Sequence, residues 1–160
     1  MRLFARRRLT AGEIALGRAI FGEEIDWARI RIAQAPPLWF AAMAPIGRTI
    51  WFGRWRAPAD FAAAPLAAQG WLLHELAHAW QAAHGRVLAL AKLGALGAGA
   101  YRIAWFPGAR WEDFNIEAQA EIVRMLFLAR AGAPTEIAHA ELERLWATRL
   151  TSRARLPGSA

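Results

Sequence analysis

The segment 65–84 constrains the fold of this chain more than any other part of the sequence. A proline suits its first turn, Gly85 is a natural stop after its last turn, and a helix of this length would span roughly 30 Å. Its side chains are apolar on almost every face, which predicts a helix buried at the centre of the molecule. Its middle nevertheless carries His74, Glu75 and His78. Buried polar groups need partners, because an unpaired one costs several kcal/mol.

The spacing of these three residues predicts a metal-dependent hydrolase. Residues four apart lie on one face of a helix, so the rings of His74 and His78 can share one zinc ion at about 2.0–2.1 Å each. Glu75 can flank the open coordination position and act as general base towards water that the metal activates. We therefore predict a zinc-dependent metallopeptidase that binds one ion per chain and cleaves a peptide or protein substrate.

A third ligand is needed, because catalytic zinc usually takes three protein groups and keeps one position open. One candidate is Glu117, on a helix expected from Asp113 or Asn115 to about Ala131. Glu121 lies four residues later on the same face. One of the two carboxylates can bind the metal while the other accepts a hydrogen bond from a ligand imidazole and fixes its tautomer.

The alternative third ligand is His84, six residues after His78. This spacing is that of the metzincin signature, except that Gln81 stands where the signature has glycine. Gln81 continues a helix comfortably, and six helical residues rotate by about 240°, so His84 would point away from His78. This geometry favours Glu117. Tyr101 is a candidate donor for stabilising the transition state.

The rest of the sequence predicts an α+β fold, mostly helical with a short sheet. We expect one domain over residues 1–150 and a frayed tail over 151–160. Further helices are expected over 10–21, opened by a capping box of Thr10 and Glu13, and from Pro134 to about Thr148. Strands are expected over 28–32, with Ala28, Ile30 and Ile32 facing inward, and over 48–52.

Composition narrows the classes of function. The chain has 160 residues, of which 56% are hydrophobic, and no cysteine. A disordered chain, a disulfide scaffold, a thiol nucleophile and a cysteine zinc ribbon are all excluded. The net charge of +7 can indicate a nucleic-acid partner, but Lys92 is the only lysine and no nucleic-acid motif accompanies the 19 arginines. We interpret the charge as ordinary surface charge and expect no nucleic-acid partner.

The sequence gives no sign of membrane insertion or secretion. The arginines within residues 1–10 are not followed by an apolar run, and the apolar run over 87–100 is too short to cross a bilayer. We expect a cytoplasmic protein without a membrane partner. Export by a machine that reads no signal peptide is compatible with this expectation.

Two motifs carry a resemblance to a known family. They are Leu73–Gln81 and Phe114–Glu121, and shorter matches are Leu9–Ile14, Phe21–Asp26 and Ala42–Pro45. Over about residues 9–130 the chain resembles a bacterial family of Vgr-related zincins. That family is similar to the core domain found with extracellular contractile injection systems.

The resemblance implies a small zincin-like fold with His74, His78 and Glu117 as zinc ligands and Glu75 as base. It also implies that Glu121 supports a ligand histidine, although other zincins carry aspartate there. A secretion apparatus becomes a candidate partner. The alternative functions are a non-catalytic zincin-fold module of a contractile injection or secretion system and a basic nucleic-acid-binding domain.

Overall fold

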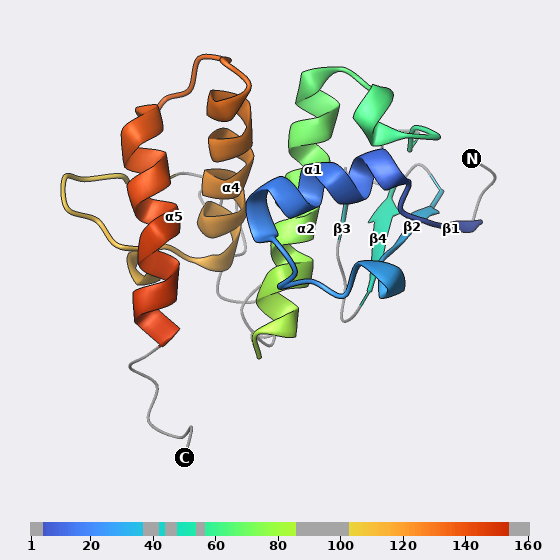
Figure 1. Ribbon diagram of the computed structural model, residues 1–160, viewed down its shortest axis with the longest axis horizontal. Coiled ribbons are helices and arrows are strands. Elements are labelled where there is room, and N and C mark those ends of the chain that lie inside the picture. Colours follow the sequence, from blue (N-terminus) through green and yellow to red (C-terminus); the bar gives the residue numbers. More distant parts are fainter. Residues whose placement is uncertain (1–4, 37–41, 44–47, 54–56, 86–102, 154–160) are drawn as a thin grey trace.

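Helix α2 (Leu66–Ala83) is the central element of the molecule. The computed structural model describes residues 5–36, 42–43, 48–53, 57–85 and 103–153 (Figure 1). Every residue from Leu72 to Gln81 is buried, and the chain leaves the helix through Gly85 at a φ of 81°. These observations confirm the predicted central helix and its bounds.

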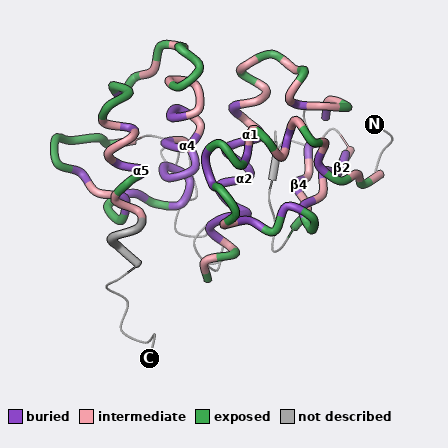
Figure 2. Tube along the Cα trace, in the orientation of Figure 1, coloured by how far each residue is buried: buried purple, intermediate pink, exposed green. Residues whose placement is uncertain are grey.

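Three further α-helices surround α2 within the described residues. Helix α1 (Ala11–Phe21) crosses it, α4 (Ile116–Arg130) packs along it, and α5 (His139–Arg153) packs on the other side of α4 (Figure 1). The buried positions, purple in Figure 2, include the run 72–81 of α2 and most of the first three turns of α4. In the described residues, no helix is long and apolar enough to cross a membrane.

A small mixed sheet lies on the side of α2 away from α5 (Figure 1). Its strands are β1 (Arg6–Arg8), β2 (Arg31–Gln34), β3 (Ala42–Met43) and β4 (Thr49–Phe52), in the order β1-β2-β4-β3. Strand β2 runs parallel to β4 with Ile32 opposite Ile50, and the two outer pairs are antiparallel. These isoleucines join Leu72 and Leu76 of α2 in one apolar core. The α+β class and the single small domain are thereby confirmed.

The first helix begins at the predicted capping box. Thr10 Oγ1 accepts a hydrogen bond from the Glu13 amide at 3.1 Å, and the Glu13 carboxylate accepts one from the Thr10 amide at 2.8 Å. Glu13 is fully buried and also accepts hydrogen bonds from Arg7 and from the Phe61 amide. The Glu13 carboxylate thus connects β1 and the segment before α2 to the start of α1.

The strand predicted over 28–32 is wrong in its first half. Residues Trp27–Arg29 form a 3-10 turn, Ala28 is exposed, and the strand begins at Arg31. The Trp27 ring is buried and its Nε1 donates to the Gly22 carbonyl at 3.1 Å. Packing of that ring takes the turn out of the sheet, so only the later half of the alternating pattern is a strand.

The last helix begins later than predicted. Residues 132–138 form a loop in which Ile137 is buried, while Pro134 is exposed. Helix α5 starts at His139 and continues to Arg153, past residue 150. The buried Ile137 anchors the loop to the core, and the chain turns into the helix only after that anchor.

Candidate metal centre

Helix α2 supplies two buried imidazole rings from one face. His74 and His78 are each 1% exposed, and their ring centroids are 5.0 Å apart at an interplanar angle of 82°. The separation of four residues places the second ring one helical turn beyond the first. Both rings lie at the interface between α2 and α4.

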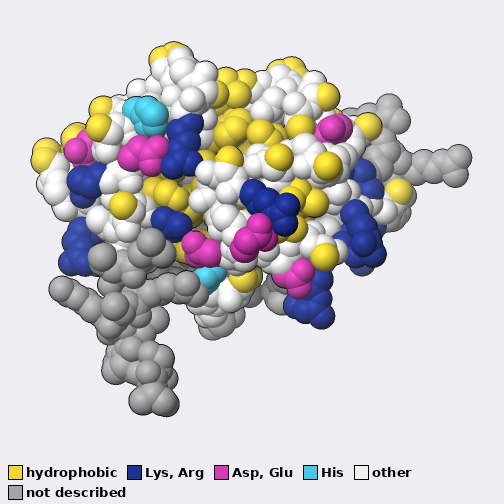
Figure 3. All heavy atoms as spheres, viewed as in Figure 1, with side chains coloured by type: hydrophobic (Ala, Val, Ile, Leu, Met, Phe, Trp, Pro, Cys, Tyr) yellow, Lys and Arg dark blue, Asp and Glu magenta, His cyan; other side chains and the backbone are white. Residues whose placement is uncertain are grey.

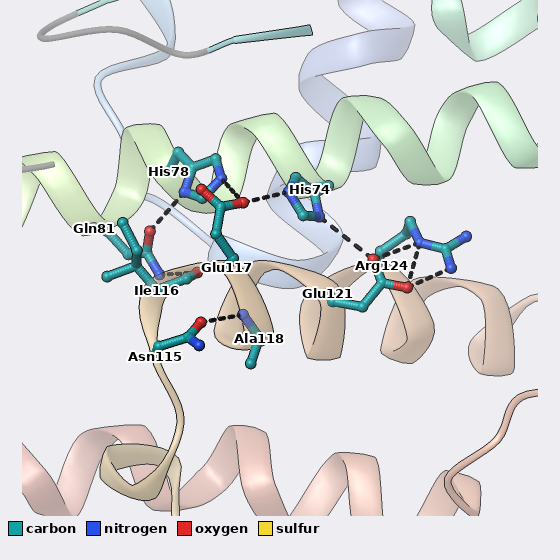
Figure 4. Close-up of polar contacts among 9 residues, drawn as sticks. All are labelled: His74, His78, Gln81, Asn115, Ile116, Glu117, Ala118, Glu121 and Arg124. Atoms are coloured by element: carbon teal, nitrogen blue, oxygen red, sulfur yellow. Dashed lines mark hydrogen bonds and ion pairs between the residues drawn. The ribbon is translucent and has the colours of Figure 1, made fainter. Parts of the chain in front are cut away.

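Helix α4 brings a carboxylate to the same place. Asn115 caps the helix by accepting a hydrogen bond from the Ala118 amide at 2.8 Å, which sets Glu117 in the first turn. Glu117 Oε2 lies 3.2 Å from His78 Nε2 and 3.4 Å from His74 Nε2 (Figure 4). The predicted residues His74, His78 and Glu117 are therefore brought together across the helix interface.

The three donor atoms fit a common metal ion. Two atoms bound to one tetrahedral zinc at the usual lengths lie about 3.4 Å apart. The donors of His74, His78 and Glu117 all lie within 4.8 Å of one another. The two ring nitrogens lie 3.4 and 3.2 Å from the carboxylate oxygen, close to the separation expected of two zinc ligands. This buried group could bind a metal ion.

The electrostatics of the group favour a cation. Burial by itself lowers the pKa of His74, but its contacts with Glu117 and Glu121 and the charge of Glu75 raise that pKa to about 9. The surrounding carboxylates therefore favour a positive charge at this ring. A divalent ion would also supply positive charge to these carboxylates.

Glu75 is the other buried acid on α2. The residue is 4% exposed, and its Oε2 has no hydrogen-bond partner in the part of the chain that the structure describes. A buried carboxylate oxygen without a partner is costly and therefore unusual in a purely structural role. Among the described residues, no contact therefore explains why this oxygen is buried.

Glu121 lies beside the group, as the sequence predicts for a supporting acid. Its Oε2 is 3.5 Å from His74 Nδ1, which is longer than a normal hydrogen bond (Figure 4). Arg124 binds the same carboxylate through Nε at 2.8 and 2.9 Å. Burial raises the pKa of Glu121, but the contact with His74 and the hydrogen bonds from Arg124 outweigh that effect and lower the pKa.

The alternative ligand His84 lies elsewhere. Its Nδ1 donates to the Trp80 carbonyl at 2.7 Å, and its Nε2 is 3.4 Å from Glu24 Oε2. The ring therefore points away from the three-donor group, as the helical rotation predicts. Tyr101, the candidate transition-state stabiliser, lies outside the described residues.

Sequence reasoning missed two buried glutamines that support the group. Gln81 is 1% exposed and contacts His78, and Gln119 is 2% exposed and contacts Gln81. A helical spacing of three between His78 and Gln81 was the available signal. The partners contributed by the second helix could not be read from the sequence.

Comparison with known proteins places these features in a family context. No protein-family model matches the chain. It is 38% identical over 138 residues to the type VI secretion system spike protein VgrG2b of Pseudomonas aeruginosa, an alignment that spans 79% of this chain but 13% of the spike protein. It also resembles the solved effector domain of Pseudomonas aeruginosa VgrG2b at 32% identity and a TM-score of 0.70, covering 90% of this chain and 83% of that one.

Proposed function

The chain belongs to the family of the Pseudomonas aeruginosa VgrG2b effector domain, and on this premise we propose that it is a zinc-dependent peptidase that serves a secretion system. The observation that carries the chemical part of the proposal is the buried group of His74, His78 and Glu117, whose donor atoms lie within 4.8 Å of one another. The fold would then be a zincin-like one. The secretion-system partner is proposed from the relative's identity as a spike protein.

The donor set supports zinc as the metal. Two imidazole nitrogens and one carboxylate oxygen are the ligands of many catalytic zinc sites, and three protein ligands leave a position open for a reactant. When bound there, zinc would polarise a carbonyl and lower the pKa of a water molecule. His74, His78 and Glu117 would hold the ion, and Glu121 would support the ring of His74.

Glu75 would be the catalytic acid and base. Its buried Oε2 has no partner among the described residues, so it can accept a proton from the water molecule that attacks the peptide carbonyl carbon. The same carboxyl group would then give this proton to the amine nitrogen as the carbon–nitrogen bond breaks. The products are one free carboxylate and one free amine.

The test combines metal analysis with peptide cleavage in matched variants. We expect one zinc per chain in the unaltered protein and in Glu75→Gln, because Glu75 is not among the three donors. Cleavage by Glu75→Gln should fall by about 10²–10⁴-fold, since the amide cannot take up the proton. Glu23→Gln, at an exposed carboxylate, is the control and should keep full activity.

Each outcome of this experiment tests a different part of the proposal. Unchanged cleavage by Glu75→Gln would show that the base is another group. An unaltered protein that binds no zinc would contradict the metal centre. Zinc binding without cleavage of a broad peptide library would favour the second candidate, a non-catalytic module of the secretion apparatus, for which membership in a spike-protein family is the supporting observation.

The nucleic-acid alternative has less support. On the face drawn in Figure 3, the arginine side chains of the described residues lie among aspartates and glutamates and do not form one continuous basic patch. Ion pairs such as Arg18 with Glu23 and Arg130 with Glu143 account for part of this mixing. DNA binding that weakens steeply with salt would restore this candidate.

A further inference from the structure

Two buried glutamines connect the histidine helix to the chain that carries Glu117. Gln81 Nε2 donates to the Ile116 carbonyl at 3.0 Å and to Gln119 Oε1 at 3.1 Å. Gln119 Nε2 in turn donates to the carbonyls of Trp111 and Phe114, each at 3.0 Å. Both hydrogens of each amide nitrogen are therefore used, and each bond is short enough to be a good one.

These bonds determine which way each amide faces. Backbone carbonyls can only accept, so the atom of Gln119 that faces two of them must be its nitrogen. Gln119 therefore presents its oxygen to Gln81. The nitrogen of Gln81 is fixed twice, by that oxygen and by the Ile116 carbonyl. Rotation of either amide by 180° would set oxygen against oxygen in a buried site.

The orientation of the Gln81 amide determines which ring nitrogen of His78 carries a hydrogen. Its remaining atom, Oε1, lies 2.9 Å from His78 Nδ1 (Figure 4). Since Oε1 can only accept, Nδ1 must carry a hydrogen, and in the neutral ring the lone pair then lies on Nε2. His78 Nε2 is the atom that approaches Glu117 Oε2 at 3.2 Å.

We propose that Gln81 is a positioning residue that fixes His78 as the tautomer protonated on Nδ1 and so presents Nε2 to the metal. The same side chain holds the carbonyl of Ile116, the residue before Glu117, so one amide sets two of the three donors relative to each other. This inference rests on the proposed metal centre but not on peptide cleavage.

The first measurement reads the ring directly. Nitrogen-15 NMR of the full chain, without metal and with zinc, distinguishes a protonated from an unprotonated Nδ1. We expect His78 Nδ1 to carry a slowly exchanging proton in both states. An unprotonated Nδ1 in either state would overturn the proposal, whether or not the protein hydrolyses peptides.

The second measurement is zinc affinity, obtained by competition with a chromophoric chelator. Gln81→Met keeps the bulk of the side chain but loses all its hydrogen bonds, and we expect zinc affinity to fall by about 10- to 100-fold. The matched control is Gln69→Met on the same helix. Gln69 also donates to two backbone carbonyls, those of Ala62 and Ala64, but contacts no donor of the metal group. The zinc affinity of the Gln69→Met variant should not change.

A third variant keeps the proposal testable should Gln81→Met fail to fold. Gln119→Met leaves Gln81 in place with its bond to Ile116 and removes the second restraint on the Gln81 amide, together with the bonds that Gln119 donates to Trp111 and Phe114. We expect a smaller loss of zinc affinity and a His78 spectrum that shows faster exchange of the Nδ1 proton. Equal zinc affinities in the Gln69, Gln81 and Gln119 variants would contradict a positioning role.

Discussion

At the scale of single residues, Glu117 turns two neighbouring histidines into a three-donor group. Its Oε2 is the atom that both Nε2 atoms approach. Glu117→Gln preserves size but replaces a charged donor with a poor one, so we expect zinc affinity to fall by more than about 100-fold. His84→Ala should leave zinc affinity unchanged, because that ring contacts Trp80 and Glu24 instead.

A graded series of variants checks this assignment by the same chelator competition. Glu121→Gln should weaken zinc binding by about tenfold, since Glu121 contacts only the outer nitrogen of His74. Should His84→Ala lose zinc while Glu117→Gln retains it, the alternative ligand suggested by the metzincin spacing would be the correct one.

Single residues of the site differ in how far the sequence predicts them. The relative positions of His74, Glu75 and His78 can be predicted because all three lie on one helix, whose period is known. Glu117 emerged only as the favoured candidate, because its approach depends on how a second helix packs. Gln81 was noticed for its place in the spacing but not for its role, since that role depends on the Ile116 carbonyl of α4.

At the scale of elements, the start of α1 is held by a buried carboxylate with several partners. Glu13 accepts hydrogen bonds from Arg7, from its own capping residue Thr10 and from Phe61. Glu13→Gln would leave the Arg7 cation without its counter-ion, so we expect a loss of about 2–4 kcal/mol in the free energy of unfolding. Thr10→Ala removes one capping bond and should cost about 1 kcal/mol.

Urea unfolding of the two variants against the unaltered chain measures both effects. The two losses of unfolding free energy are compared, because they would be equal if Glu13 acted only as part of the helix cap. A Glu13→Gln loss no larger than that of Thr10→Ala would show that the contacts with Arg7 and Phe61 add nothing.

Element boundaries were predictable where local chemistry sets them. The capping box at Thr10, the Asn115 cap and the glycine after α2 act through their own backbone neighbours, and these ends lie where the sequence predicts. The start of β2 and the start of α5 depend instead on the burial of Trp27 and Ile137. Periodicity cannot tell which apolar side chain will anchor a loop, so both starts were misplaced.

At the scale of the whole molecule, α2 is the central element, with α4 along one side and the sheet on another (Figure 1). The α+β class follows from one buried helix and two predicted strands, which correspond to β2 and β4, while β1 and β3 were not predicted. The interface of α2 with α4 carries the candidate metal group, and the sheet and α1 cover other parts of α2 (Figure 1). The order of the strands depends on contacts between distant segments and could not be derived from local patterns.

A second set of contacts joins three elements near the C-terminal end of α2. Glu24, just after α1, accepts a hydrogen bond from Trp80 Nε1 at 2.9 Å and one from Arg149 of α5 at 3.1 Å. Burial raises the pKa of Glu24, but these hydrogen bonds and the charge of Arg149 outweigh it and hold the pKa below 4.5. One carboxylate thus joins the α1 loop, α2 and α5.

The sign of the resulting pH dependence follows from the direction of that shift. A carboxyl group with a lower pKa in the folded state stabilises the fold fully above its unfolded pKa, and this contribution is lost as pH falls through the folded value. We expect Glu24→Gln to unfold at lower urea than the unaltered chain at pH 7. The difference should shrink progressively below about pH 4.5.

Urea unfolding from pH 7 to pH 3, with a chelator present throughout, isolates this contribution from metal loss. Glu143→Gln is the matched control: Glu143 also pairs with an arginine, but 41% of its side chain is exposed, so water and salt weaken the pair. We expect that control to give a smaller difference at pH 7. A Glu24→Gln deficit that stays constant down to pH 3 would show that the residue acts through packing, because a lost carboxylate charge must cease to matter once the carboxylate is protonated.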